Sequence, residues 1–177
     1  MSSSRTPGGL VLVTGGTGFI GSHACVSLVQ AGFSPVIFDN LSNSSRGVLP
    51  RLAEICGQSI PFVEGDIRDR AALRQLFQTY RPVAVIHFAG LKSVSESVEQ
   101  PGRYHENNVT GSQYLLEAMQ EAAVKQLVFS SSATVYGVPE SVPIAESAPL
   151  KTSNPYGQSK LDVEQLLAEW CAADPQW

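Results

Sequence analysis

Four short segments combine residue types and spacings that could bind a ligand or carry out chemistry. The first is rich in glycine: Gly16, Gly18 and Gly21 form the pattern G-x-G-x-x-G, and Gly15, Gly18 and Gly21 form a related variant. It follows the apolar segment 10–14 and opens a segment with helical spacing. A glycine turn between a strand and a helix brings N–H groups and the positive end of the helix dipole to an anion. In that context the pattern predicts a dinucleotide pyrophosphate site, and a plain glycine-rich turn is the alternative.

An acidic residue closes the next apolar segment. Asp39 lies 18 residues after Gly21, close to the roughly 20 expected for the carboxylate that binds the adenosine ribose. A carboxylate at that place repels a 2′-phosphate, and the following Asn40 and Leu41 bring no cation. The segment therefore favours NAD over NADP, and the alternative is a turn aspartate that caps a loop.

Tyr156 and Lys160 are four residues apart on a predicted helix, so their side chains share one face. A free phenol is protonated at neutral pH because its pKa is about 10. A neighbouring ammonium and an oxidised nicotinamide both favour the phenolate, which could then act as a general base. With five Tyr and four Lys in the chain, this spacing alone is weak evidence and depends on its surroundings.

Hydroxyl side chains gather at 130–134, where another apolar segment ends. Ligands of open parallel sheets bind at that end of the strands. Ser132 and Thr134 could therefore contact a substrate hydroxyl, although such residues also bond to their own backbone. The three histidines show no metal-binding spacing, and His87 lies in an apolar segment, as is typical of a core histidine. No metal site is predicted.

The order of apolar segments predicts the elements that position these residues. We expect strands over 10–14, 35–39, 61–66, 82–89 and 125–132, and helices over 19–31, 45–56, 69–80, 103–123 and 155–173. The strands are continuously apolar, which indicates a sheet covered on both faces. The alternation predicts an α/β fold with a doubly wound parallel sheet of Rossmann type over 10–177, after a disordered lead-in over 1–9. Such sheets normally have six strands, so the chain is expected to be truncated after about five, without a C-terminal substrate domain.

Composition narrows the functional classes further. The chain has 177 residues, of which 43% are apolar, so its bulk is a folded domain rather than a disordered segment. Its net charge is −4 and its basic residues form no run, which argues against a nucleic-acid or anionic membrane surface. No apolar stretch reaches the ~20 residues of a membrane span, and the N-terminus lacks a signal-peptide core, so a cytoplasmic location is expected. The odd cysteine number and the absence of CxxC argue against a disulfide framework.

Seven segments, taken in order, resemble the UDP-glucose 4-epimerases of the extended short-chain dehydrogenase/reductase family. They are VTGGTGFIGSH (13–23), DNLSNSS (39–45), EGDIRD (64–69), VIHFAGLKSVSESVEQP (85–101), NNVTGS (107–112), LVFSSSATVYG (127–137) and SNPYGQSKLDVEQ (153–165). The resemblance implies an isomerase that interconverts UDP-glucose and UDP-galactose with bound NAD. It also implies a UDP-hexose substrate and a homodimer formed through helices 103–123 and 155–173.

The same resemblance implies roles for individual residues. Those expected to bind NAD are Gly15, Gly18, Phe19, Ile20, Gly21, Asp39, Asn40, Leu41, Ser42, Asn43, Ser44, Asp66, Ile67, Phe88, Ala89, Gly90, Leu91, Lys92, Asn107, Tyr156 and Lys160. Ser132 and Tyr156 are expected to contact the sugar, with Tyr156 as the general base. Lys160 is expected to hold the nicotinamide ribose, and Thr134 to assist at the sugar hydroxyl. Phe19 stands where the family commonly has Tyr.

Two alternatives stay open from the sequence. The family's enzymes are much longer than this chain, so most sugar-binding residues are expected in an absent half and the chain alone is expected to be inactive. Another NAD-dependent nucleotide-sugar epimerase or decarboxylase is one alternative, and a non-catalytic NAD-binding fragment is the other. A nucleotide-sugar dehydratase is disfavoured, because such enzymes place an acidic pair beside the catalytic threonine, whereas Thr134 lies between Ala133 and Val135.

Overall fold

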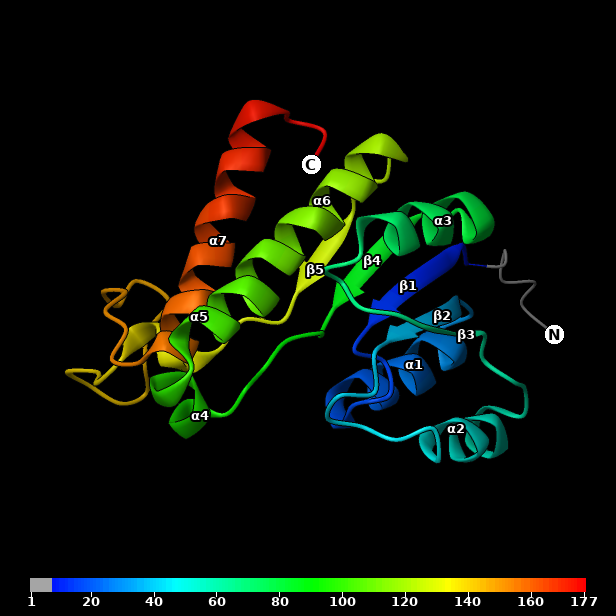
Figure 1. The fold of residues 1–177 in the computed structure, drawn as a ribbon, viewed down its shortest axis with the longest axis horizontal. Helices are drawn as coiled ribbons and strands as arrows, with labels where there is room; N and C mark the ends of the chain where they lie inside the picture. Colours follow the sequence, from blue (N-terminus) through cyan, green and yellow to red (C-terminus); the bar gives the residue numbers. More distant parts are fainter. Residues whose placement is uncertain (1–7) are drawn as a thin grey trace, which may run out of the picture.

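The computed structural model describes residues 8–177. Most of the expected disordered lead-in, residues 1–7, lies outside the described residues. The fold is a parallel sheet with helices packed on its two faces (Figure 1). The Gly8 N–H donates to the Gly32 carbonyl oxygen at 2.9 Å, so the hydrogen-bonded fold includes the two glycines that precede strand β1 (Leu10–Thr14).

The sheet has the strand order β3-β2-β1-β4-β5, and all of its pairs are parallel. The other strands are β2 (Ser34–Asp39), β3 (Phe62–Glu64), β4 (Ala84–His87) and β5 (Leu127–Phe129). The predicted doubly wound parallel sheet is confirmed. The last three strands are shorter than predicted at both ends, because the flanking residues lie outside the paired ladder of the sheet.

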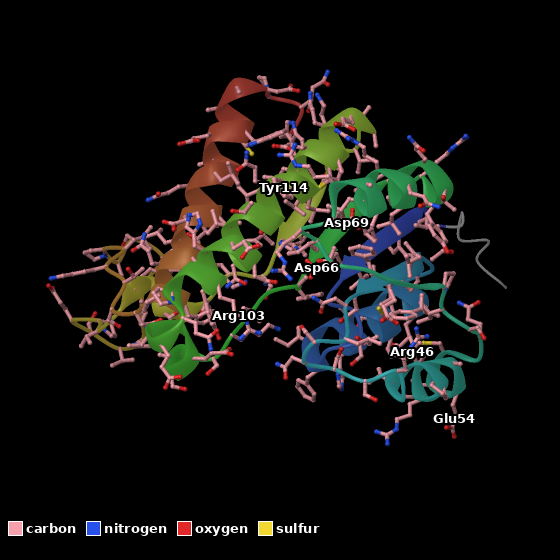
Figure 2. All side chains as sticks on the ribbon, in the orientation of Figure 1. Arg46, Glu54, Asp66, Asp69, Arg103 and Tyr114 are labelled. Carbon is pink, nitrogen blue, oxygen red and sulfur yellow. The ribbon has the colours of Figure 1, made fainter. Side chains whose placement is uncertain are left out.

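Five helices of nine or more residues pack on the sheet in the described part of the chain, and side-chain caps explain where two of them begin. These helices are α1 (Phe19–Gln30), α2 (Val48–Cys56), α3 (Arg70–Tyr80), α6 (Gly111–Glu121) and α7 (Pro155–Ala173). Asp69 caps α3 by accepting from Ala71 N and Ala72 N, and it lies where that helix starts (Figure 2). Asn154 caps α7 by accepting from Gly157 N at 2.8 Å. Helix α7 has the predicted bounds, 155–173.

The predicted helix over 103–123 is wrong in one respect, since it is divided. Helix α5 (Pro101–Tyr104) leads into a π-helical turn, η1 (His105–Thr110), and then into α6. Because a π-turn contains an extra residue, Asn107 and Asn108 are both buried. A further short helix, α4 (Val94–Glu99), was not predicted. Its signal is the spacing Ser93-x-x-Glu96, in which Ser93 caps the helix by accepting from Glu96 N.

The core is divided by the sheet, because successive residues of each strand face opposite sides. Leu12 packs with α3 and α6, whereas Val11 and Val13 pack with α1 and α2. Cys25 of α1 is fully buried in the second layer, and burial raises the pKa of its thiol to about 12. None of the helices within residues 8–177 is long and apolar enough to cross a membrane.

Candidate active site

A cavity of about 270 Å³ opens at the carboxyl ends of the central strands. The cavity lies beside the end of β1. Strand β1 is the central strand, with β2 on one side and β4 on the other. The helices that follow β1 and β4 therefore cover opposite faces, and an open α/β sheet binds its ligands at such a switch point. A larger groove of about 650 Å³ lies between α3 and α6 at the opposite edge of the sheet, and none of the predicted site residues lines it.

Most of the predicted cofactor residues line the cavity. These are Gly15, Gly18, Phe19, Asp39, Asn40, Ser42, Asn43, Ser44, Ile67, Phe88, Ala89, Gly90, Leu91, Lys92 and Asn107. The lining does not include Ile20, Gly21, Leu41, Asp66, Tyr156 or Lys160. It does include Phe38 and Gly65, which were not predicted. A Cβ at Gly65 would lie 2.3 Å from Phe38 Cε2, so glycine leaves room for this ring.

The glycine turn allows three backbone segments to meet at one end of the cavity. Gly15 has a φ of +67°, and its N–H donates to Phe38 O at 2.9 Å. A Cβ at Gly15 would lie 2.7 Å from Ala89 N, and one at Gly21 would lie 2.3 Å from Gly15 O. Gly18 is the N-cap of α1 and has no side chain that could occupy the N–H groups of the first turn. The turn is therefore a fitting cradle for a pyrophosphate.

Asp39 ties the glycine turn to the loop that follows β2. One carboxylate oxygen accepts from Thr17 N at 3.1 Å, and the other accepts from Leu41 N at 2.9 Å and from Ser44 Oγ at 3.2 Å. The bond to Leu41 holds that residue in the left-handed region, at a φ of +57°. Among the described residues that line the cavity, Asp39 is the one carboxylate and Lys92 the one cation.

Asp66 supports the same loop from behind the cavity lining. Its carboxylate accepts from Asn40 Nδ2 at 3.0 Å and from Arg68 Nη2 at 2.8 Å. Figure 2 shows Asp66 at the carboxyl edge of the sheet, near the start of α3. Hydrogen bonds from Arg68 lower the pKa of Asp66 to about 2, so the carboxyl group remains ionised at neutral pH.

The predicted catalytic pair lies at the start of α7. Tyr156 is buried, and its ring meets the Tyr104 ring edge-on with 6.5 Å between centroids. Lys160 is buried one turn later; its Nζ donates to Ser130 O at 2.8 Å and lies 4.6 Å from the centre of the Phe129 ring. Burial lowers the pKa of Lys160 to about 8, and the charge of Lys92 adds to that shift.

The predicted hydroxyl residues face this helix across a close contact. Ser132 Oγ accepts from Thr134 N at 3.2 Å and from Thr134 Oγ1 at 2.9 Å, at the start of the short 3₁₀ turn η2 (Ala133–Tyr136). A Cβ at Gly157 would lie 2.8 Å from Thr134 O. Glycine after Tyr156 therefore lets the hydroxyl turn approach the helix that contains the tyrosine and the lysine.

Asn108 joins the cavity wall to α7, and the sequence analysis missed it. Its side chain accepts from Leu91 N at 2.8 Å and donates to Leu91 O at 3.0 Å and to Ser159 Oγ at 2.9 Å. A Cβ at Gly90 would lie 3.2 Å from Asn108 Oδ1 and 3.8 Å from Lys160 Nζ. The lysine therefore adjoins the wall of the cavity at Gly90. Two consecutive asparagines in a helical segment were the available signal.

His87 lies beneath the site and is a core histidine, as predicted. Its Nδ1 lies 2.6 Å from Thr14 Oγ1 and its Nε2 lies 2.9 Å from Ser112 Oγ. Thr14 Oγ1 also accepts from Ala89 N at 3.3 Å, which connects the histidine to the cavity wall. Burial lowers the pKa of His87 to about 3, and the charge of Lys160 acts in the same direction, so the ring is neutral.

This histidine predicts a pH dependence of stability. Because its pKa is about 6.5 in the unfolded chain and about 3 in the fold, the unfolded chain binds the extra proton as the pH falls from 6.5 towards 3. Between pH 7 and pH 5 this linkage lowers the free energy of unfolding by about 2 kcal/mol. Urea unfolding at pH 7 and pH 5 measures this loss of stability. We expect the loss in His87→Gln to be about 2 kcal/mol smaller than the loss in the unmodified chain. The exposed His23 and His105 are common to both proteins, and equal losses would contradict the assignment.

The strand order, the glycine turn and the acidic end of β2 together define a Rossmann-type fold of the dinucleotide-binding class. The family is named by comparison with known proteins. The chain belongs to the NAD dependent epimerase/dehydratase family, whose sequence profile matches residues 11–176.

Several relatives are closely similar. A UDP-glucose 4-epimerase of Neisseria gonorrhoeae is 58% identical over 168 residues, which are 94% of this chain and 50% of that protein. A UDP-glucose 4-epimerase of Bacillus subtilis is 54% identical over 167 residues, which are 94% of this chain and 49% of that protein. The structure of UDP-glucose 4-epimerase from Bifidobacterium longum in complex with NAD⁺ and UDP aligns with a TM-score of 0.93 and 46% identity, over 95% of this chain and 50% of that chain. The chain thus spans about half the length of the curated relatives it matches.

Proposed function

We propose that this chain provides the NAD-binding half of a UDP-glucose 4-epimerase, which interconverts UDP-glucose and UDP-galactose. The observation that supports this most is the position of Lys160 Nζ next to Gly90 in the cavity wall, 3.8 Å from where a Cβ of that residue would lie. A helix bearing a tyrosine and a lysine, a turn of hydroxyls and a dinucleotide cavity then converge on one place. The names of the relatives with 54–58% identity support the same reaction.

The residues present fit NAD. We propose that the glycine turn with Phe19, Ile20 and Gly21 holds the diphosphate, that the loop 39–44 holds the adenosine ribose, and that Asp66 and Ile67 flank the adenine. The segment 88–92 and Asn107 would line the nicotinamide half. When bound, NAD supplies the reversible hydride acceptor that oxidation at the sugar C4 requires.

The protein's own groups then handle the proton and the orientation of the sugar. Tyr156 Oη takes the proton of the 4-hydroxyl as C4 is oxidised and returns it when C4 is reduced from the opposite face. Lys160 provides positive charge beside this phenol and binds the nicotinamide ribose. Ser132 binds the sugar near C4, and Thr134, whose hydroxyl donates to Ser132 Oγ, supports it.

Cofactor choice is the first testable consequence. We expect the chain to bind NAD more tightly than NADP, because the buried Asp39 carboxylate would repel a 2′-phosphate, and Lys92, the one cation that residues 8–177 contribute to the lining, comes from the loop after β4. Asp39→Asn removes this repulsion and should reduce the difference between the affinities for NAD and NADP. Isothermal titration with both nucleotides measures it. Equal or tighter binding of NADP by the unmodified chain would show that Asp39 does not select the cofactor.

The reaction itself is tested in a chimaera. Residues 10–177 replace the matched half of the Neisseria gonorrhoeae relative, and the purified chimaera is incubated with UDP-galactose. We expect UDP-glucose to form, and the reverse conversion to occur from UDP-glucose. A folded chimaera that binds NAD but interconverts neither sugar, while the Neisseria protein does, would refute the proposed function.

We also propose that the protein forms a homodimer through the helices at 103–123 and 155–173, which are α5, η1 and α6 on one side and α7 on the other. The support is the family resemblance, together with the packing of α7 against both α5 and η1, which makes them one continuous layer. Light scattering of the chimaera tests the proposal, and a monomer would exclude it.

A further inference from the structure

The segment that follows β5, which begins with Ser130 and Ser131, is hydrogen-bonded to two residues on successive turns of helix α7. At the first, Lys160 Nζ donates to the main-chain oxygen of Ser130 at 2.8 Å. At the second, Ser131 Oγ donates to the carboxylate of Glu164. Lys160 and Glu164 are four residues apart and so lie on the same face of the helix. Ser130 and Ser131, the two residues that precede Ser132, are therefore bound by two residues of opposite charge.

The charges around Lys160 are unbalanced without Glu164. Lys92 contributes a second cation from the loop after β4, and His87 on β4 is neutral. Glu96 of α4 accepts from the Tyr104 hydroxyl at 2.9 Å and pairs with Arg103, so its charge is already neutralised by α5. Tyr156, on α7 itself, is the proposed base and adds neither a further cation nor a carboxylate. Among the described residues, Glu164 is the carboxylate whose charge opposes the effect of Lys92 on Lys160.

We propose that Glu164 is a positioning residue, whose carboxylate is held against the turn by the Ser131 hydroxyl and serves as the counter-charge that keeps Lys160 protonated beside Lys92. This inference rests on the proposed function, because Lys160 is a catalytic residue only in that reaction. Glu164 acts through Lys160 and the turn.

The consequence concerns the state of Lys160 near neutral pH. Burial and Lys92 already lower the pKa of Lys160 to about 8, and the charge of Glu164 acts in the opposite direction. Without that charge the pKa falls further, and much of Lys160 becomes a neutral amine at the pH of the reaction. A neutral amine cannot balance the negative charge of the Tyr156 phenolate that must form before Tyr156 takes the sugar proton.

The titration of Lys160 tests the proposal directly in the 177-residue chain. Lysine labelled with ¹³C at Cε gives one signal for each of the four lysines of the sequence, and Lys160→Arg identifies the signal of interest. Glu164→Gln removes the charge but keeps an oxygen that accepts from Ser131. We expect it to lower the titration midpoint of Lys160 by about one pH unit.

The matched variant, Ser131→Ala, keeps the charge but frees the carboxylate, so the midpoint should fall in the same direction by a smaller amount. An unchanged midpoint in a folded Glu164→Gln variant would overturn the proposal, as would a larger fall in Ser131→Ala than in Glu164→Gln. If Glu164→Gln does not fold, Glu164→Ala carries the same prediction. The titration needs neither NAD nor a UDP-sugar, so its outcome is independent of whether the chimaera is active.

Discussion

Replacing Tyr156 with phenylalanine is expected to slow epimerisation by the chimaera about 10²–10⁴-fold, which is the usual loss when a general base is removed. NAD should stay bound, because the aromatic ring that packs edge-on against Tyr104 is retained. The Michaelis constant should change far less than kcat, since Tyr156→Phe keeps the ring in place and removes only the hydroxyl that handles the proton. Initial rates with UDP-galactose and calorimetry with NAD measure the two effects.

A matched control removes a phenol elsewhere. Tyr114 lies on α6 (Figure 2). The guanidinium carbon of Arg70 lies 3.9 Å from the centre of its ring, and Tyr114 is not among the residues that line the cavity. Tyr114→Phe should therefore keep the parental rate. A Tyr156→Phe variant with kcat within a few-fold of the parent would exclude Tyr156 as the base.

The second large effect is expected from the 177-residue chain by itself. We expect it to interconvert the two UDP-sugars many orders of magnitude more slowly than the chimaera. The groups proposed to contact the sugar, Ser132, Thr134 and Tyr156, gather at one end of α7 and cannot surround a nucleotide sugar. Loss of positioning can remove up to ~7–11 kcal/mol of rate acceleration. Parallel assays at equal concentration measure the difference, and equal rates would contradict the expectation.

The same chain is expected to self-associate. Strand β5 pairs with β4 on one side, and within residues 8–177 it is the last strand of the sheet. Val128 in this edge strand is 62% exposed, and an exposed apolar edge pairs readily with another chain. Size-exclusion chromatography with light scattering should show oligomers, and Val128→Lys should reduce them. A monomer with an unmodified edge would contradict this.

Features set by neighbouring residues could be predicted from the sequence. Asp69 and Asn154 cap their helices through N–H groups two or three residues away, so the starts of α3 and α7 were predictable. The continuous apolar strands indicated a covered parallel sheet, and that is the sheet observed. The π-turn could not be predicted in this way, because the side chain of Asn108 stabilises it through Leu91 and Ser159, which are 17 and 51 residues away in the chain.

The candidate site shows the same limit. The glycine turn and Asp39 follow a spacing along one strand, one helix and the next strand, so the sequence indicated both. Glu164 gave no such signal, because its partner Ser131 is 33 residues away in the chain. Phe38 looked like an ordinary core residue, and the absence of a Cβ at Gly65 is what leaves room for its ring.

The strand order has a consequence for synthesis on the ribosome. Because the order is β3-β2-β1-β4-β5, every strand made after β2 is added at an outer edge, and none must be inserted between strands already paired. A nascent chain can therefore assemble the β1–β2–β3 layer first, as N-terminal segments generally do. The hydrogen bond between Thr14 and His87 can form only after the 73 residues that lead from one to the other have been made. The glycine turn thus gains its contact with Ala89 long after it is made, and α7 joins the site only after all five strands of residues 8–177 have been made.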